Sequence, residues 1–241
     1  SSDLSEKVVR LPRGFMPRDP AVLPDASPRT RGLAGLPQQG FVFANFNSAF
    51  KINPPVFAAW MRLLGQVEGS VLWLQRQSAP VVENLRAEAK RLGIDPQRLI
   101  FAEREPTLAG HYARLALADL FLDTSPYNAH TTASDALWVG LPVVTWLGPT
   151  FASRAAASLL KNMGFPELVA PDAAAWEALA LSLARDPVRL GELRARLAGA
   201  RESSGLFDMS RLAREVEAAF VQMHERAQRG ESPAAFDVPS A

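Results

Sequence analysis

The regular alternation of short apolar runs with amphipathic segments constrains the fold of this chain more than any other feature. The segments between the runs carry apolar residues at three-and-four spacing and several end in glycine, as helices do. Strands that alternate with such helices form right-handed βαβ crossovers. We therefore predict an α/β fold with a doubly wound, Rossmann-like parallel sheet. The predicted strands are 41–45, 71–75, 99–102, 120–123, 142–146 and 167–170.

Proline content and composition divide the rest of the chain. Residues 12–37 contain six prolines and no apolar periodicity, so we predict a connector over residues 1–38. The α/β lobe is expected over 39–205 and a C-terminal helix over 206–229. The polar end of the chain, 230–241, is expected to be disordered.

The overall composition argues against several classes of function. Lys and Arg number 26 against 25 Asp and Glu, a formal net charge of +1, so no global field would attract nucleic acid or an anionic membrane. The chain has no cysteine, and its histidines (His111, His130 and His224) are poorly spaced for a metal site. We find no secretory signal and no apolar run of membrane-spanning length. We expect a soluble, cytoplasmic protein without a metal cofactor.

Polar residues follow three of the predicted strands. In open parallel sheets, ligands bind outside the carboxyl ends of the strands. The loop after 41–45 carries Lys51 just before a helix that starts with proline. A lysine in this position can reach an anion, although a solvated surface lysine is the alternative.

A histidine and an arginine follow the strand at 99–102. His111 and Arg114 lie one helical turn apart at the start of a helix, so they can face one ligand. An imidazole can stack on a base while a guanidinium hydrogen-bonds its edge. The alternative is an ordinary pair on a helix surface.

Hydroxyl side chains follow the strand at 120–123. Thr131 and Thr132 begin a helix, where unpaired N–H groups and a partial positive charge favour a phosphate. Thr132 and Asp135 also fit a capping box, in which the acid only satisfies the backbone. The sequence leaves binding and capping equally open.

The three loops are expected at the same edge of the sheet, and together they favour a nucleotide diphosphate. No Gly-x-Gly-x-x-Gly motif follows the first strand, which argues against a dinucleotide dehydrogenase. A P-loop and an Asp-x-Asp pair are also missing from the sequence. The charge on a leaving diphosphate would then be met by Lys51 and backbone donors.

At these residues the sequence resembles the C-terminal catalytic lobe of the protein O-GlcNAc transferases, glycosyltransferase family 41. The resemblance covers roughly residues 40–170, and the upstream SEKVVRLPRGFMPRD is similar to the family's inter-lobe link. It implies the C-terminal lobe of a GT-B enzyme, and we expect a bacterial homologue. The segments that carry it are FVFANFNSAFKINP, SVLWLQR, RLIFAE, LADLFLDTSPYNAHTTASDALWVGLPVVT, FASRAAASLL and MGFPELVA.

The resemblance implies a set of residues that bind the UDP-sugar. By this resemblance, Lys51 would be the catalytic residue, in contact with the β-phosphate of the leaving UDP. The chain departs from the family at Ser48, where glutamine is common, and in the loop before His111, which is one residue longer and lacks a lysine. The implied donor-site residues are Ser48, Lys51, His111, Arg114, His130, Thr131, Thr132 and Asp135.

The other implied roles concern the nucleotide. His111 would stack near uracil with Arg114 beside it. The run from His130 to Thr132 would hold the diphosphate, and Asp135 would bind the ribose. None of these roles follows from spacing alone.

The implied reaction is inverting transfer of GlcNAc from UDP-GlcNAc to a Ser or Thr hydroxyl of an acceptor protein or peptide. Its partners would be an N-terminal catalytic lobe and tetratricopeptide repeats, neither visible in this sequence, and the proton acceptor would lie outside the chain. Three alternatives stay open. They are a related soluble transferase that glucosylates asparagine, a UDP-binding module without catalysis, and a purely structural use of the same residues.

Overall fold

A six-stranded parallel sheet forms the centre of the computed structural model, which describes residues 5–16, 18, 20–26 and 29–240. Its spatial order is β4-β3-β2-β5-β6-β7, so the strands, taken along the chain, follow the Rossmann order 3-2-1-4-5-6. Every neighbouring pair is parallel. The strands are β2 (Val42–Asn45), β3 (Val71–Gln75), β4 (Leu99–Ala102), β5 (Leu120–Leu122), β6 (Val143–Trp146) and β7 (Val169–Ala170).

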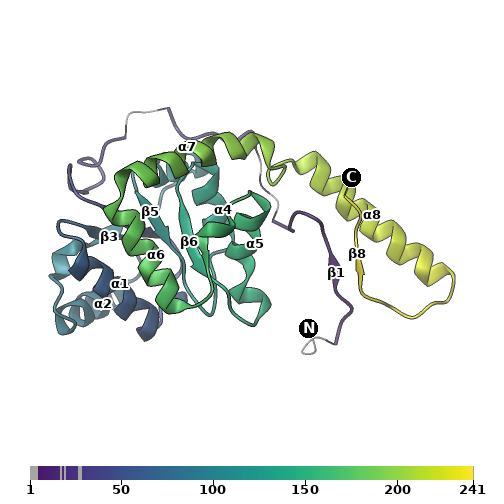
Figure 1. Ribbon diagram of the computed structural model, residues 1–241, viewed down its shortest axis with the longest axis horizontal. Coiled ribbons are helices and arrows are strands. Elements are labelled where there is room, and N and C mark those ends of the chain that lie inside the picture. Colours follow the sequence, from purple (N-terminus) through teal and green to yellow (C-terminus); the bar gives the residue numbers. More distant parts are fainter. Residues whose placement is uncertain (1–4, 17, 19, 27–28, 241) are drawn as a thin grey trace.

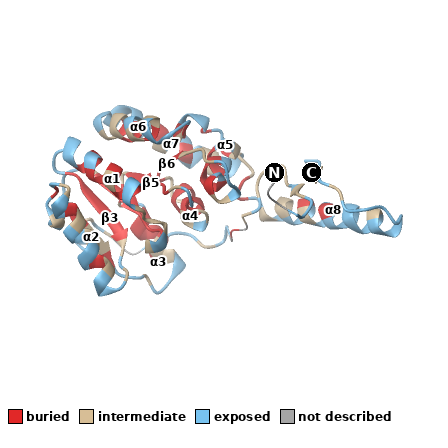
Figure 2. Cartoon of the chain, turned by 90° about the horizontal axis from the view of Figure 1, so that it is seen from below, coloured by how far each residue is buried: buried red, intermediate tan, exposed pale blue. Residues whose placement is uncertain are grey.

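Helices cover both faces of this sheet, as the crossovers require. The helix α1 (Pro54–Gln66) packs on β3 and against α6 (Ala173–Arg185), while α4 (Thr131–Trp138) and α5 (Ala155–Asn162) cover the opposite face (Figure 2). The sheet residues are almost all buried because they lie between these layers. The remaining helices of the lobe are α2 (Ala79–Arg91), α3 (Leu108–Leu115) and α7 (Pro187–Ser203), with short 3-10 turns at Ala49–Lys51, Pro96–Arg98, Phe151–Ser153 and Pro166–Leu168.

The predicted class and all six predicted strands are confirmed, with ends that differ by at most two residues. The helical stretch expected over 172–201 is two helices, because Asp186 ends α6 and Pro187 begins α7. Asp186 also caps the second helix, since its carboxylate accepts a hydrogen bond from Arg189 N at 2.9 Å.

The strand order places the ligand crevice. Of the strands in this sheet, β2 comes first along the chain and lies between β3 and β5. The strands that follow are therefore added on one side of β2 first (β3, β4) and then on its other side (β5, β6, β7). Such a switch point opens a crevice outside the carboxyl ends of the two central strands, here β2 and β5. The loops after Asn45 and Leu122 border it.

The two ends of the chain extend from the lobe beside a long helix, α8 (Met209–Gln228), as Figure 1 shows. The tail expected to be disordered contains a short strand, β8 (Phe236–Asp237), which pairs in parallel with β1 (Val9–Arg10). The prediction of disorder is therefore wrong at this strand, because the tail finds backbone partners in the connector. Nothing in its local composition signals that pairing.

The connector also packs on the lobe itself. Arg31 pairs with Asp119 at 2.7 Å, and Leu36 is buried in the main core. Among the described residues, no helix is both long enough and apolar enough to cross a membrane.

Candidate functional site

Asparagine side chains join the two loops at the switch point. Asn45 donates from Nδ2 to the carbonyl of Leu122 at 2.7 Å, and its Oδ1 accepts from Asn47 N at 3.0 Å. Asn47 in turn donates from Nδ2 to Thr124 Oγ1 at 3.1 Å. These residues are buried, so the bonds set the position of one loop against the other.

Lys51 lies across this junction. Its Nζ donates to the carbonyl of Asn128 at 2.8 Å and stands 4.0 Å from the centre of the Tyr127 ring. Burial lowers the pKa of Lys51, and the nearby Asp123 carboxylate opposes that shift. An ammonium has three N–H donors, so two remain for a ligand. The surface-lysine alternative is wrong.

Asp123 organises the loop that holds Lys51. It is fully buried at the end of β5, where its carboxylate accepts from Thr124 N at 2.7 Å, Ala129 N at 2.6 Å and Thr145 Oγ1 at 2.6 Å. Burial raises the pKa of Asp123 to about 7, against the lowering effect of these three bonds. The two backbone donors bend residues 123–129 into a closed loop.

The start of α4 faces the same crevice. Thr132 donates from Oγ1 to Asn47 Oδ1 at 2.5 Å, and the helix N-cap is His130, without a side-chain capping bond. The capping-box alternative for Thr132 and Asp135 is therefore wrong. The N–H groups of Ala133 and Ser134 donate to the His130 carbonyl. Those of the exposed Thr131 and of Thr132 have no partner among the described residues, so they are the free donors of the first turn.

His130 is held by its neighbours in the loop. Its Nε2 lies 3.5 Å from the carbonyl of Ala152, and its ring meets that of Tyr127 at a centroid distance of 5.2 Å. Burial lowers the pKa of His130, while its hydrogen bond to Ala152 has the opposite effect. The imidazole is thus fixed beside Tyr127, the residue that also stacks on Lys51.

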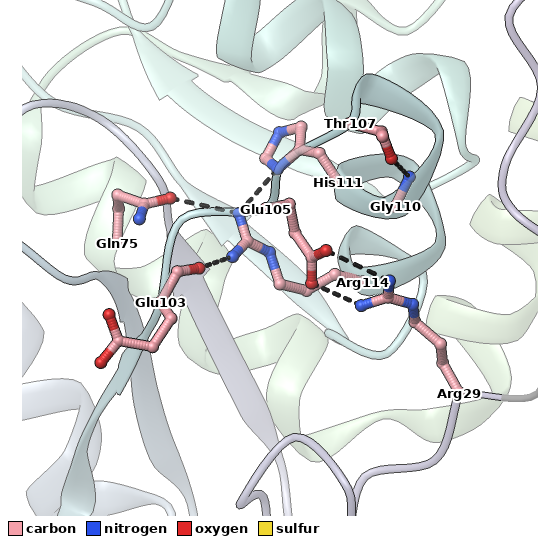
Figure 3. Close-up of polar contacts among 8 residues, drawn as sticks. All are labelled: Arg29, Gln75, Glu103, Glu105, Thr107, Gly110, His111 and Arg114. Atoms are coloured by element: carbon pink, nitrogen blue, oxygen red, sulfur yellow. Dashed lines mark hydrogen bonds and ion pairs between the residues drawn. The ribbon is translucent and has the colours of Figure 1, made fainter.

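The loop after β4 builds a buried polar cluster around Arg114 (Figure 3). Arg114 Nη2 donates to His111 Nδ1 at 2.8 Å and to Gln75 Oε1 at 3.1 Å, while Nη1 donates to the carbonyl of Glu103. Arg114 is only 4% exposed, so the helix-surface alternative for this pair is wrong. Thr107 caps the start of α3, where its hydroxyl accepts a hydrogen bond from Gly110 N at 3.1 Å.

The cluster determines the proton position on His111. Since a guanidinium can only donate, His111 Nδ1 must be the acceptor and Nε2 must carry the proton. Burial, followed by the charge of Arg114, lowers the pKa of His111 to about 4, so the ring is neutral at pH 7. Its Nε2 faces Asp135 Oδ2 at 3.7 Å.

Asp135 lies behind His111 and is already engaged. Its Oδ1 accepts from Arg18 Nη1 of the connector at 2.5 Å, and its side chain is 6% exposed. Burial raises the pKa of Asp135, and the hydrogen bond from Arg18 counters it. A ribose could reach this carboxylate only if Arg18 or His111 moved.

The loops after β2 and β4 also touch each other. The Phe46 ring meets the His111 ring edge-on at 5.8 Å and lies 4.6 Å below the Arg114 guanidinium. Ser48, by contrast, is exposed just before the 3-10 turn Ala49–Lys51, and its side chain makes no capping hydrogen bond. The structure therefore brings Lys51, His111 and the start of α4 to one sheet edge.

A cavity of about 630 Å³ opens beside the Arg114 cluster. Trp73 and the loop after β4 form one wall, and connector residues 29–35 form the other, where Arg29 pairs with Glu105. Trp73 Nε1 and Arg114 Nε are buried without a hydrogen-bond partner among the described residues. Both nitrogens are enclosed, so the cavity meets Trp73 and Arg114 through other atoms.

Several site residues are absent from the sequence predictions. Asp123 could have been found, since it is the first polar residue at the carboxyl end of a predicted strand. Asn47 and Asn128 also lie in the loops singled out, but amides gave no charge signal. Arg18 had no signal, because its contact with Asp135 spans 117 positions.

The acidic and histidine side chains do not gather into a metal-ligand set. Within the part of the chain that the structure describes, no three His, Cys, Asp or Glu residues lie close enough to hold an ion together.

Comparison with known proteins identifies relatives of the whole lobe. The chain is 38% identical over 195 residues to a Caenorhabditis elegans UDP-N-acetylglucosamine–peptide N-acetylglucosaminyltransferase, a match to 81% of this chain and 17% of that protein. It is 32% identical to the probable enzyme of the same description, SEC, from Arabidopsis thaliana, over 97% of this chain and 24% of the relative.

A solved structure agrees with these matches. A mutant O-GlcNAc transferase from Thermobaculum terrenum superimposes with a TM-score of 0.81 and 31% identity, covering 92% of this chain and 42% of that one. The chain thus spans less than half the length of each relative. The model of Glycosyl transferase family 41 matches residues 24–216, and the chain belongs to that family.

Proposed function

We propose that this chain is the donor-binding half of an inverting protein O-GlcNAc transferase, which binds UDP-GlcNAc and stabilises UDP as it leaves. The supporting observation is that Lys51 and the start of α4 face each other across the switch point, tied by Asn47 and Asn128. An ammonium and unpaired helix N–H groups favour a diphosphate. The choice of GlcNAc as the transferred sugar rests on the names of the relatives.

The proposed chemistry is a single displacement at the sugar. The acceptor hydroxyl oxygen bonds to the anomeric carbon from the face opposite UDP, and the bond from that carbon to the β-phosphate oxygen breaks. The electron pair stays on UDP, where negative charge grows in the transition state. In this proposal Lys51 Nζ and the first-turn donors at Thr131 and Thr132 bind that charge, and no metal ion takes part. The hydroxyl proton goes to a group outside this chain.

The proposed places of the nucleotide follow from the same geometry. The neutral ring of His111 and the guanidinium of Arg114, which are hydrogen-bonded to each other, border the region where a uracil would lie. His130 and the two threonines face the diphosphate. For Asp135 we propose ribose contact through Oδ2 once the His111 ring shifts aside, while Oδ1 stays bonded to Arg18.

We further propose that the chain works with a second catalytic lobe, tetratricopeptide repeats and an acceptor protein or peptide, in the cytoplasm. The fraction of each relative that the chain covers supports the extra lobe. The helix α8 also supports the extra lobe, because it extends from the sheet domain (Figure 2) and leaves Phe220 62% and Val221 56% exposed. The absence of cysteine is compatible with a reducing compartment.

The test is turnover by the longer protein that contains this lobe. With UDP-GlcNAc and an acceptor protein, mass spectrometry should find GlcNAc on Ser or Thr, and Lys51→Met should lower kcat about 100-fold or more. Lys161→Met, at an exposed position on α5, is the matched control. Glucose on asparagine would indicate the related transferase, and normal turnover by Lys51→Met would contradict the proposal.

A further inference from the structure

The guanidinium of Arg18 is buried against the outer side of the candidate donor site. Its side chain is 5% exposed, pairs with Asp135 at 2.5 Å and stacks over the rings of Tyr112 (4.3 Å) and Trp138 (4.8 Å). Nε and Nη2 have no hydrogen-bond partner among the described residues. Burying a cation this far is costly unless its charge is matched, so the contact with Asp135 is central.

Asp135 stands between Arg18 and His111. One carboxylate oxygen takes the bond from Arg18, and the other faces His111 Nε2 at 3.7 Å. On the far side of the same imidazole, Nδ1 accepts from Arg114. A row of four side chains therefore runs from the connector into the proposed uracil region.

We propose that Arg18 is a positioning residue, which acts through Asp135 to keep His111 neutral and protonated on Nε2, and so links the connector to the nucleotide site. This inference rests on the proposed function for its nucleotide readout. No motif marks Arg18 in the sequence, and the connector was expected only to join two lobes.

The charges around His111 give the sign of the effect. Arg114 on its own helix, Glu105 in the preceding loop, Arg18 from the connector and Asp135 from α4 all face it. Tyr112, next to His111 on α3, is also hydrogen-bonded to Asp135, and burial keeps its phenol protonated by raising its pKa to about 12, so it adds no charge. Without Arg18, the buried carboxylate of Asp135 would have lost its paired cation and would lie beside the imidazole of His111. Such a pair takes up a proton more readily, and its apparent pKa rises.

Protonation would disturb the site for a geometric reason. In the imidazolium form Nδ1 also carries a proton and points at the donor Nη2 of Arg114, 2.8 Å away. Two donors cannot share that contact, and two cations repel. The Arg114 cluster would then have to open, which should weaken nucleotide binding.

The direct test is NMR of the His111 imidazole in the full 241-residue chain. The expected result for wild type is the Nε2–H tautomer and a pKa below 5. A pKa above 6, or the Nδ1–H tautomer, would overturn the proposal without any variant. In Arg18→Met the apparent pKa of the Asp135–His111 pair should rise, because the carboxylate then lacks its paired cation.

The nucleotide test compares UDP affinities by calorimetry at pH 7.5 and 5.5. Dividing each variant's affinity by that of wild type at the same pH cancels the titration of UDP itself. For Arg18→Met the ratio should fall on acidification, by up to about tenfold, which is the change in neutral fraction for a group with the ordinary histidine pKa of about 6.5. For Arg18→Lys, which keeps the cation, and for Arg18→Met/Asp135→Asn, which removes the carboxylate, the ratio should stay nearly constant.

Arg31→Met is the matched control, since Arg31 is a connector arginine paired with Asp119 away from His111. A ratio that falls equally in Arg31→Met would show a general loosening of the connector and overturn the proposal. So would a constant ratio in a folded Arg18→Met. Failure of wild type to bind UDP would instead refute the proposed function, and the NMR result would still decide the role of Arg18.

Discussion

Replacing Asp123 by alanine is expected to destabilise the protein by several kcal/mol. The carboxylate is fully buried and takes three hydrogen bonds, two from backbone N–H groups and one from Thr145. Each buried donor left unpaired costs about 1–3 kcal/mol. Water in the vacated space would satisfy part of this, so we expect a loss of about 3–5 kcal/mol in the free energy of unfolding.

The Asp123→Asn variant separates charge from hydrogen bonding. Burial raises the pKa of Asp123 to about 7 in the folded protein, above its ordinary value in the unfolded chain. The folded state therefore binds the proton more tightly, and this group's contribution to stability is present at low pH and lost as the pH rises to 7. Asparagine does not ionise, so the Asp123→Asn variant does not lose this stability as the pH rises. The stability of Asp123→Asn relative to wild type should thus increase from pH 4 to 7.5, by about 4 kcal/mol at most.

Urea unfolding followed by circular dichroism, at several pH values, measures both effects. Thr145→Val is a useful control, because it removes one donor to the same carboxylate and leaves the backbone donors in place. A loss below about 1 kcal/mol in Asp123→Ala would refute the role of the carboxylate in closing its loop. A stability difference for Asp123→Asn that is independent of pH would refute the raised pKa.

Other variants test the site and its support. Thr132→Val removes the hydroxyl that donates to Asn47, and UDP affinity should fall about 3- to 10-fold by calorimetry; unchanged affinity would limit the hydroxyl to a local role. Trp176→Ala should cost about 3–5 kcal/mol in urea unfolding, since the buried ring fills the core and its Nε1 donates to the Val144 carbonyl; a loss under 1 kcal/mol would contradict that packing. Arg98→Met should cost about 1–3 kcal/mol in urea unfolding, because the guanidinium satisfies three backbone carbonyls in the last turn of α1 and just after it.

The fold could be predicted because its signals are local. Each strand is a compact apolar run, and each helix carries its own periodicity and end signals, such as Pro54 at the start of α1. The strand order could not be predicted in the same way, because right-handed crossovers are compatible with more than one order. The prediction of disorder failed in the tail. There β8 forms because β1, more than 220 positions away, offers backbone partners.

The site could be predicted in part for the same reason. Lys51, His111 and Thr132 lie at the carboxyl ends of recognisable strands, so topology alone brings them together. Their partners could not be predicted, because Asn128 and Arg18 act through a carbonyl and a long-range ion pair. Spacing suggested that Asp135 caps its own helix, yet its carboxylate points to the connector.

Calorimetric titration of UDP into this chain tests most directly the claim that the three loops form one diphosphate site. We predict one UDP bound per chain, with Lys51→Met weakening it about 10- to 100-fold, as expected for the loss of a charge-assisted hydrogen bond. Added chelator should leave the affinity of wild type unchanged. No detectable binding by wild type, or equal affinities for wild type and Lys51→Met, would contradict the account.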